Sequence, residues 1–133
     1  MIRQELYIRK YDWSLHIYYA VTKYRVGEIM ERLSDIGCNE EFAGRAYENM
    51  VSGKLNHGLT YSNYGKRETV MVIGLASSAA EYADSIVHEL FHLTEHIVEA
   101  SGIVFSGERP AYLIGDVMRS MHGVAGRFIC GCH

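Results

Sequence analysis

Hydrophobic and polar positions alternate with a period of two near the start of the chain. One face of residues 13–21 is apolar throughout, with Trp13, Leu15, Ile17, Tyr19 and Val21. That alternation, rich in aromatic and branched side chains, predicts a strand packed on a core. The stretch 6–10 is expected to be its hairpin partner, with the turn near 11–12.

A second hairpin is predicted further along the chain. Residues 59–62 and 68–75 are separated by Asn63-Tyr64-Gly65-Lys66, a sequence typical of a tight turn. The run 69–73 is apolar on both of its faces, so we expect this strand to be covered on both sides.

Between and after the hairpins the period becomes helical. Apolar spacing over 26–36 predicts a helix that Gly37 ends with a left-handed cap. Asn39 is expected to cap a second helix, which Gly53 ends. The chain is therefore expected to follow its first hairpin with two short helices.

Two longer helices are predicted in the second half of the chain. Ser78-Ala79-Ala80-Glu81 is a capping box that opens a helix running to about Ser101. A last helix is expected from about Gly107 to Met121, with Pro110 tolerated in its first turn. The tail 123–133 shows little pattern.

These elements predict one α+β domain over residues 1–133, with a small, mostly antiparallel sheet packed on the long helix and on the helix after it. The first part, 1–57, holds a hairpin and two helices. The second, 58–122, holds a hairpin and the two long helices, and 123–133 is a tail. The connections contain no repeat and no linker.

Composition narrows the class of protein. The chain has 133 residues, is 48% hydrophobic and carries a net charge of −3, which suits a globular domain and gives no basic footprint for nucleic acid. No apolar run is long enough for a signal peptide or a membrane span. Three cysteines are an odd number and are best explained as thiols in a reducing compartment. We therefore expect a cytoplasmic protein that binds neither nucleic acid nor a membrane.

The candidate chemistry lies on the first long helix, in His88-Glu89-Leu90-Phe91-His92. Residues four apart share one helical face, so both imidazoles can reach one metal ion, for which zinc is the expected identity. Glu89 lies about 100° round the helix from His88. It is placed beside the ligands, where a general base for a metal-activated water must stand.

A catalytic zinc site normally takes a third protein ligand. The candidates are Glu95, His96, Glu99, Glu108, Asp116 and His122. His96 lies about 12 Å along the helix from His88, too far for one ion to reach both easily. Glu95 and Glu99 are on the same rigid helix and are better placed to orient an imidazole or to face solvent.

Glu108 is the preferred third ligand. The glycine-bounded connection 101–107 can turn the chain back and place Glu108, in the first turn of the last helix, beside the motif. Tyr112 follows one turn later and is a candidate for hydrogen bonding to a developing oxyanion. Asp116 could hold a histidine's second nitrogen or lie on the surface, and His122 stays open as an alternative ligand.

Two simpler interpretations stand beside this one. The histidines could be core residues bonded to their neighbours, with Glu89 on the solvated side of the helix. The terminal Cys130-Gly131-Cys132-His133 offers soft ligands for zinc or copper, although its spacing is unlike that of structural zinc sites.

His88-Glu89-x-x-His92, followed sixteen residues later by a glutamate at the head of the next helix, resembles the gluzincin branch of the zincin metallopeptidases, including its minimal single-domain members. The resemblance implies zinc held by His88, His92 and Glu108, with Glu89 as general base. It also implies a small sheet over the motif helix, whose edge strand aligns an extended peptide.

The expected function is therefore zinc-dependent hydrolysis of peptide bonds in peptide or protein substrates. The substrate is expected to add as a strand to the edge of the sheet, at a strand such as 68–75. A chain of 133 residues has little room for a walled specificity pocket, so a second copy or a protein partner is a candidate to complete the cleft. The alternatives are a non-catalytic binding protein of the same fold and a metal hydrolase acting on another bond.

Overall fold

The computed structural model describes residues 1–130 of the chain. The strands are β1 (Ile2–Ile8), β2 (Trp13–Val21), β3 (Gly58–Asn63) and β4 (Glu68–Gly74). The helices are α1 (Val26–Asp35), α2 (Glu40–Ser52), α3 (Ala79–Ala100) and α4 (Glu108–Ile129), with short 3₁₀ turns η1 (Arg9–Tyr11) and η2 (Lys23–Arg25). None of the helices within 1–130 is both long and apolar enough to cross a membrane. The predicted α+β class is confirmed.

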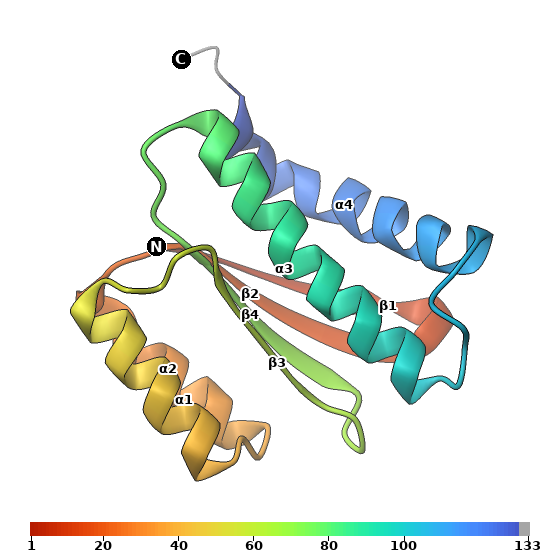
Figure 1. Ribbon diagram of the computed structural model, residues 1–133, viewed down its shortest axis with the longest axis horizontal. Coiled ribbons are helices and arrows are strands. Elements are labelled where there is room, and N and C mark those ends of the chain that lie inside the picture. The colour runs from red at the N-terminus through yellow and green to blue at the C-terminus, as the bar shows by residue number, and fades with distance from the viewer. Residues whose placement is uncertain (131–133) are drawn as a thin grey trace.

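The four strands form one mixed sheet in the order β1-β2-β4-β3 (Figure 1). The hairpins β1–β2 and β3–β4 are antiparallel, and they join through a parallel pair, β2 with β4. The expectation that 68–75 supplies a free edge is wrong, because β4 is bonded on both sides. The sheet edges are β1 and β3.

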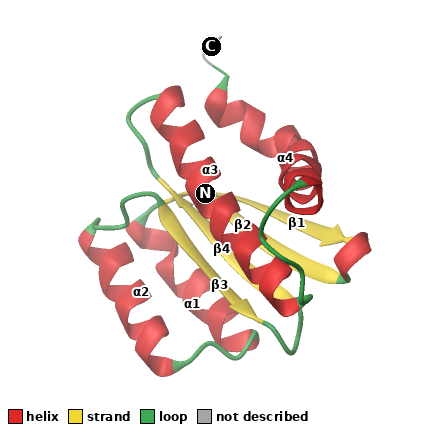
Figure 2. Cartoon of the chain, turned by 45° about the vertical axis from the view of Figure 1, so that its right-hand side comes forward, coloured by secondary structure: helices red, strands yellow, loops and turns green. Residues whose placement is uncertain are grey.

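Helices cover both faces of the sheet. Helices α3 and α4 pack on one face, around Trp13, Leu15 and Ile17, whereas α1 and α2 cover the other, around Tyr18 (Figure 2). The alternation of β2 sends successive side chains to the two cores as far as Tyr19. A register shift between Tyr19 and Val21 then places Val21 in the core with Tyr18, which is opposite to the predicted face. The predicted burial of 69–73 on both faces is confirmed, since all five side chains are buried.

The predicted helix ends are confirmed by their caps. The Asn39 carboxamide oxygen accepts from the Phe42 N–H at 2.7 Å, and Ser78 Oγ accepts from the Glu81 N–H at 3.1 Å. Gly37 and Gly53 end α1 and α2 with φ of 78° and 72°, a conformation that glycine adopts without steric cost. Local sequence therefore decides where these helices begin and stop.

The last helix is longer than predicted. It continues past Met121 to Ile129, so most of the predicted tail is helical. Phe128 explains the extension, because its ring stacks on Tyr82 and Tyr19 with centroids 4.7 and 5.6 Å away. This contact with the core outweighs the low helix propensity of the two glycines in the stretch. The first strand also begins earlier than predicted, at Ile2, and the residues after Ile8 form η1.

Candidate metal centre

The two motif histidines converge on the solvent-facing side of α3. Their side chains are 46% and 42% exposed, and the Nε2 atoms of His88 and His92 lie 3.3 Å apart. The Glu95 carboxylate lies 3.1 Å from Nδ1 of His92. Because a carboxylate can only accept, Nδ1 carries the hydrogen and Nε2 of neutral His92 presents a lone pair.

The separation of these nitrogens fits a shared metal ion. Two nitrogens that each bind one tetrahedral zinc at ~2.0–2.1 Å stand roughly 3.3–3.4 Å apart, and the observed separation is 3.3 Å. The contact between His92 and Glu95 is also typical of a metal ligand, whose other ring nitrogen usually donates to a carboxylate. The pair therefore fits two positions of a zinc site.

Glu89 is buried beside the pair. Its residue is only 2% exposed, Oε1 accepts from the Thr60 hydroxyl at 2.8 Å, and Oε2 lies 3.9 Å from Nε2 of His88. Burial raises the pKa of this carboxyl. The hydrogen bond from Thr60 and the nearby imidazoles lower the pKa, but their effect is smaller than that of burial. The alternative interpretation, with buried histidines and a solvated Glu89, is wrong, because the two histidines are exposed and Glu89 is buried.

Glu89 is buried because β3 lies directly over it. A Cβ on Gly58 would stand 1.8 Å from the Val72 carbonyl oxygen and 3.2 Å from Cγ of Glu89. Only glycine permits so close an approach of β3 to both β4 and α3. Thr60, two residues further along β3, then donates to the carboxylate.

A third imidazole, His57, belongs to this cluster and was not among the sequence candidates. Its ring stacks on that of His88 with centroids 4.3 Å apart and an interplanar angle of 7°. Its Nε2–H donates to the Asp84 carboxylate, at 3.1 Å, one turn before His88. No motif marks His57, because its position depends on the packing of β3 against α3.

The electrostatics of α3 favour a cation. The helix contains five acidic residues and no lysine or arginine. Three of the five carboxylates, those of Asp84, Glu89 and Glu95, lie within 4 Å of an imidazole nitrogen of the cluster. A divalent cation bound there would meet an environment of opposite charge.

Glu108 is not part of this cluster. It is the first residue of α4, its side chain is exposed, and no group of three or more His, Cys, Asp or Glu side chains within residues 1–130 is placed to hold a metal ion. Tyr112 is 62% exposed, and Asp116 pairs instead with Arg119 at 2.9 Å. His122 is exposed on α4, where a Cβ on Gly126 would stand 3.3 Å from its ring.

The connection before α4 does turn back along α3, as the sequence predicted. The ring of Phe105 packs edge-on against Phe91, with centroids 5.2 Å apart, and Phe91 contacts His92 in turn. Glu108 follows Phe105 by three residues, a span of at most ~11 Å. The loop therefore passes beside the motif helix shortly before α4 begins. Within residues 1–130 the Glu108 carboxylate still makes no contact with the two histidines.

His96, one turn beyond the motif, has a different environment. Its Nδ1 lies 2.6 Å from the hydroxyl of Ser62, which in turn contacts the Thr69 hydroxyl at 2.7 Å. The indole N–H of Trp13 donates to Thr69, also at 2.7 Å. Burial lowers the pKa of His96, and the neighbouring imidazole of His92 lowers it further. His96 is thus a hydrogen-bonded structural residue.

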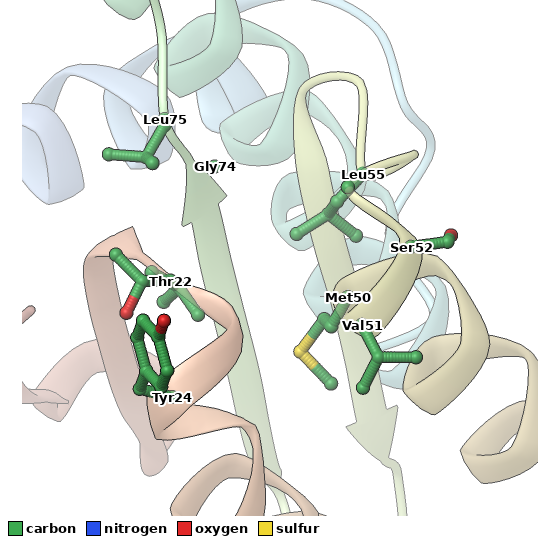
Figure 3. Close-up of a pocket in the computed structure, with 10 residues that line it drawn as sticks. Thr22, Tyr24, Met50, Val51, Ser52, Leu55, Gly74 and Leu75 are labelled. Carbon is green, nitrogen blue, oxygen red and sulfur yellow. The ribbon is translucent and has the colours of Figure 1, made fainter.

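An apolar hollow of about 470 Å³ opens elsewhere, outside the carboxyl ends of the parallel strands β2 and β4 (Figure 3). Met50 and Leu55 line one wall, and Tyr24 and Leu75 the other. None of the motif residues lines it. The hollow is therefore separate from the candidate metal centre.

The terminal cysteine cluster falls largely outside the described residues. Cys130 follows α4 and is exposed, whereas Cys132 and His133 lie beyond residue 130. Cys38 is a free thiol whose pKa burial raises, in keeping with a packing role.

A scan against protein-family models, a search of curated proteins and a search of solved structures each find no match for this chain.

Proposed function

We propose that the chain is a zinc-dependent metallopeptidase of minimal zincin-like fold. The observation that carries the proposal is the convergence of the His88 and His92 Nε2 atoms, 3.3 Å apart, beside the buried carboxylate of Glu89. A buried general base next to two exposed, oriented imidazoles is an arrangement that a structural metal site does not need. The resemblance of the motif to the gluzincins supports the same function.

The roles of the residues follow from their contacts. His88 and His92 hold the ion, and Glu95 fixes the tautomer of His92 so that its Nε2 lone pair is available. A bound zinc supplies Lewis acidity, which polarises the scissile carbonyl and acidifies water. Glu89 takes the proton of the attacking water and passes it to the leaving amine. Burial favours this transfer, because it raises the pKa of Glu89 and so strengthens the base.

Glu108 is proposed as the third ligand. Its support is the reversal of the loop 101–107, which brings Phe105 against the motif helix at Phe91. Within residues 1–130 Glu108 contacts neither histidine, so this role requires the first turn of α4 to move toward the ion. His57 is the rival, because its ring already contacts His88.

A peptide substrate fits the surface beside the motif. Within residues 1–130 strand β3 pairs only with β4, so its other edge leaves backbone donors and acceptors free for an extended chain. The same strand holds Glu89 through Thr60. Binding of a peptide along β3 therefore brings its backbone next to the base, which favours peptide bonds over other hydrolysable bonds.

The test combines metal content with hydrolysis. Purified protein is reconstituted with zinc, dialysed and assayed by mass spectrometry for bound metal, then tested on a denatured protein mixture with and without chelator. We expect one zinc per chain and chelator-sensitive cleavage. Glu89→Gln should retain zinc and lose at least ~10³-fold in rate, because it removes the base. Glu99→Gln, the same change on the far turn of α3, is the matched control.

Two further variants decide the third ligand. Glu108→Gln should lose zinc and His57→Gln should keep it if Glu108 is the ligand, and the reverse result would transfer the role to His57. Protein that takes up no zinc would overturn the proposal. Zinc binding without cleavage of any peptide would favour the non-catalytic alternative.

A further inference from the structure

A second site lies where four separate segments of the chain meet. A hollow of about 450 Å³ is bordered by Arg9, Lys10, Arg67 and Arg109, together with Tyr11, Asp12, Ser101 and Ile103. Four of these side chains are cationic and one is acidic, so the hollow has a formal excess of three positive charges. The whole chain carries −3, so this concentration of cations runs against the general charge of the protein.

The cations of this hollow are not neutralised by ion pairs. No lysine or arginine of the hollow forms a salt bridge within residues 1–130. The other arginine ion pairs, such as Arg45 with Glu41, lie elsewhere on the molecule. Unpaired cations gathered around one concave site attract an anion.

Arg67 is fixed in place at the back of the hollow. Its Nε donates to the Tyr11 carbonyl at 3.0 Å, its Nη2 donates to the same oxygen, and its guanidinium lies 5.2 Å from the Trp13 ring centroid. The residue has φ of 54°, a left-handed conformation that glycine adopts at lower cost. These contacts fix the position of the Arg67 positive charge before any ligand binds.

Two buried hydroxyls belong to residues that border the hollow. Among the described residues, Tyr11 Oη and Ser101 Oγ are buried and find no hydrogen-bond partner. Both residues line this hollow, and Tyr11 is 93% buried, with 7% of its surface exposed. Both oxygens are enclosed by protein and closed to solvent, so recognition of a ligand in the open hollow falls to the arginines and the lysine around it.

We propose that this basic hollow binds a phosphate group, either as inorganic phosphate or as the phosphomonoester end of a small molecule. Arginine matches the oxygens of phosphate in two-point hydrogen bonds, and a dianion offsets most of the local charge. The net negative charge of the whole chain favours a single small anion over a polyanion such as nucleic acid. The site shares no residue with the metal centre and stands whether or not the chain hydrolyses peptides.

The experiment is a calorimetric titration of the full-length, chelator-treated protein at constant ionic strength. Inorganic phosphate and phenyl phosphate are titrated separately, and a single-stranded oligonucleotide serves as the third probe. We expect saturable binding with one site per chain. Arg9→Gln and Arg109→Gln should each weaken it roughly tenfold, because each removes a charged hydrogen-bond donor. Arg45→Gln should leave it unchanged.

The two phosphate probes separate the sources of the ligand. Tighter binding of phenyl phosphate assigns the hollow to a phosphorylated small molecule, and equal or weaker binding assigns it to inorganic phosphate. No saturable binding of either would overturn the proposal. So would equal weakening by Arg45→Gln, or tighter binding of the oligonucleotide than of both small anions. Arg9 and Arg109 are exposed, so their variants should keep the unfolding midpoint of the original chain.

Discussion

Two consecutive turns of α3 carry histidines at the same spacing of four residues but in different environments. At the first, His88 and His92 are exposed and direct their Nε2 atoms toward one another. At the second, His96 is half-buried under β3 and shares a hydrogen bond with the Ser62 hydroxyl. Helical spacing makes His88–His92 and His92–His96 equivalent pairs, so the difference between them comes from what lies beside each turn.

The neighbour that differs is the strand β3. Opposite the first turn, Gly58 and Thr60 leave the imidazoles open and engage Glu89 instead. Opposite the second, Ser62 reaches the ring of His96 and connects it through Thr69 to Trp13. One strand thus leaves one pair of histidines available for a metal and uses the third for stability.

The largest expected effect comes from removing one histidine at each turn. His92→Ala should weaken zinc binding by more than the ~10–100-fold that loss of a supporting partner costs, with stability of the metal-free protein changed by less than about 0.5 kcal/mol. His96→Ala should keep zinc affinity and lose about 1–3 kcal/mol, since Ser62 loses its partner. Zinc titration and urea unfolding measure both. Equal zinc affinities in the two variants would contradict the distinction.

A smaller effect is expected from the carboxylates that hold these rings. Glu95→Gln should weaken zinc binding by ~10–100-fold, because the amide no longer fixes the tautomer of His92 as a carboxylate does. The control is Glu99→Gln, whose carboxylate accepts from Tyr64 at 3.0 Å and contacts neither motif histidine within the described residues. Competition with a chromogenic chelator gives both affinities. If the two variants bind zinc equally, Glu95 has no role in orienting His92.

The hydroxyl chain beneath His96 should affect stability alone. Thr69→Val keeps the shape of the side chain and removes the hydroxyl that joins Trp13 to Ser62. An unpaired indole N–H in the core costs about 1–3 kcal/mol, measured as a shift in the urea midpoint. Zinc affinity should not change. A stable variant with impaired zinc binding would show that the two turns are coupled.

The smallest expected effect is a pH dependence that belongs to His96. Burial lowers its pKa in the folded state below the ordinary 6.5, so the unfolded chain binds the proton more readily. The stability this confers is complete above pH 6.5 and is lost as the pH falls through the folded pKa. The metal-free protein should therefore lose stability between pH 7 and 5 more steeply than His96→Asn. Parallel unfolding curves for the two proteins over that range would count against the assignment.

The positions of many helices and strands could be predicted because they depend on residues close together in the sequence. Alternation set the range of β2, and side chains next to the backbone set the caps at Asn39 and Ser78. The parallel pairing of β2 with β4 depends on contacts far apart in sequence and was not predicted. The extension of α4 to Ile129 likewise depends on Phe128 reaching Tyr19 and Tyr82.

The sequence by itself determined that His88, Glu89 and His92 share one stretch of helix, because a helix of fixed pitch places residues one and four apart without help from the rest of the molecule. Tertiary structure alone decided that Glu89 is buried, that His57 stacks on His88, and that His96 is bound by Ser62. These depend on where β3 crosses α3. That crossing is set by the summed packing of the sheet on its two layers of helices, a quantity that no short stretch of sequence encodes.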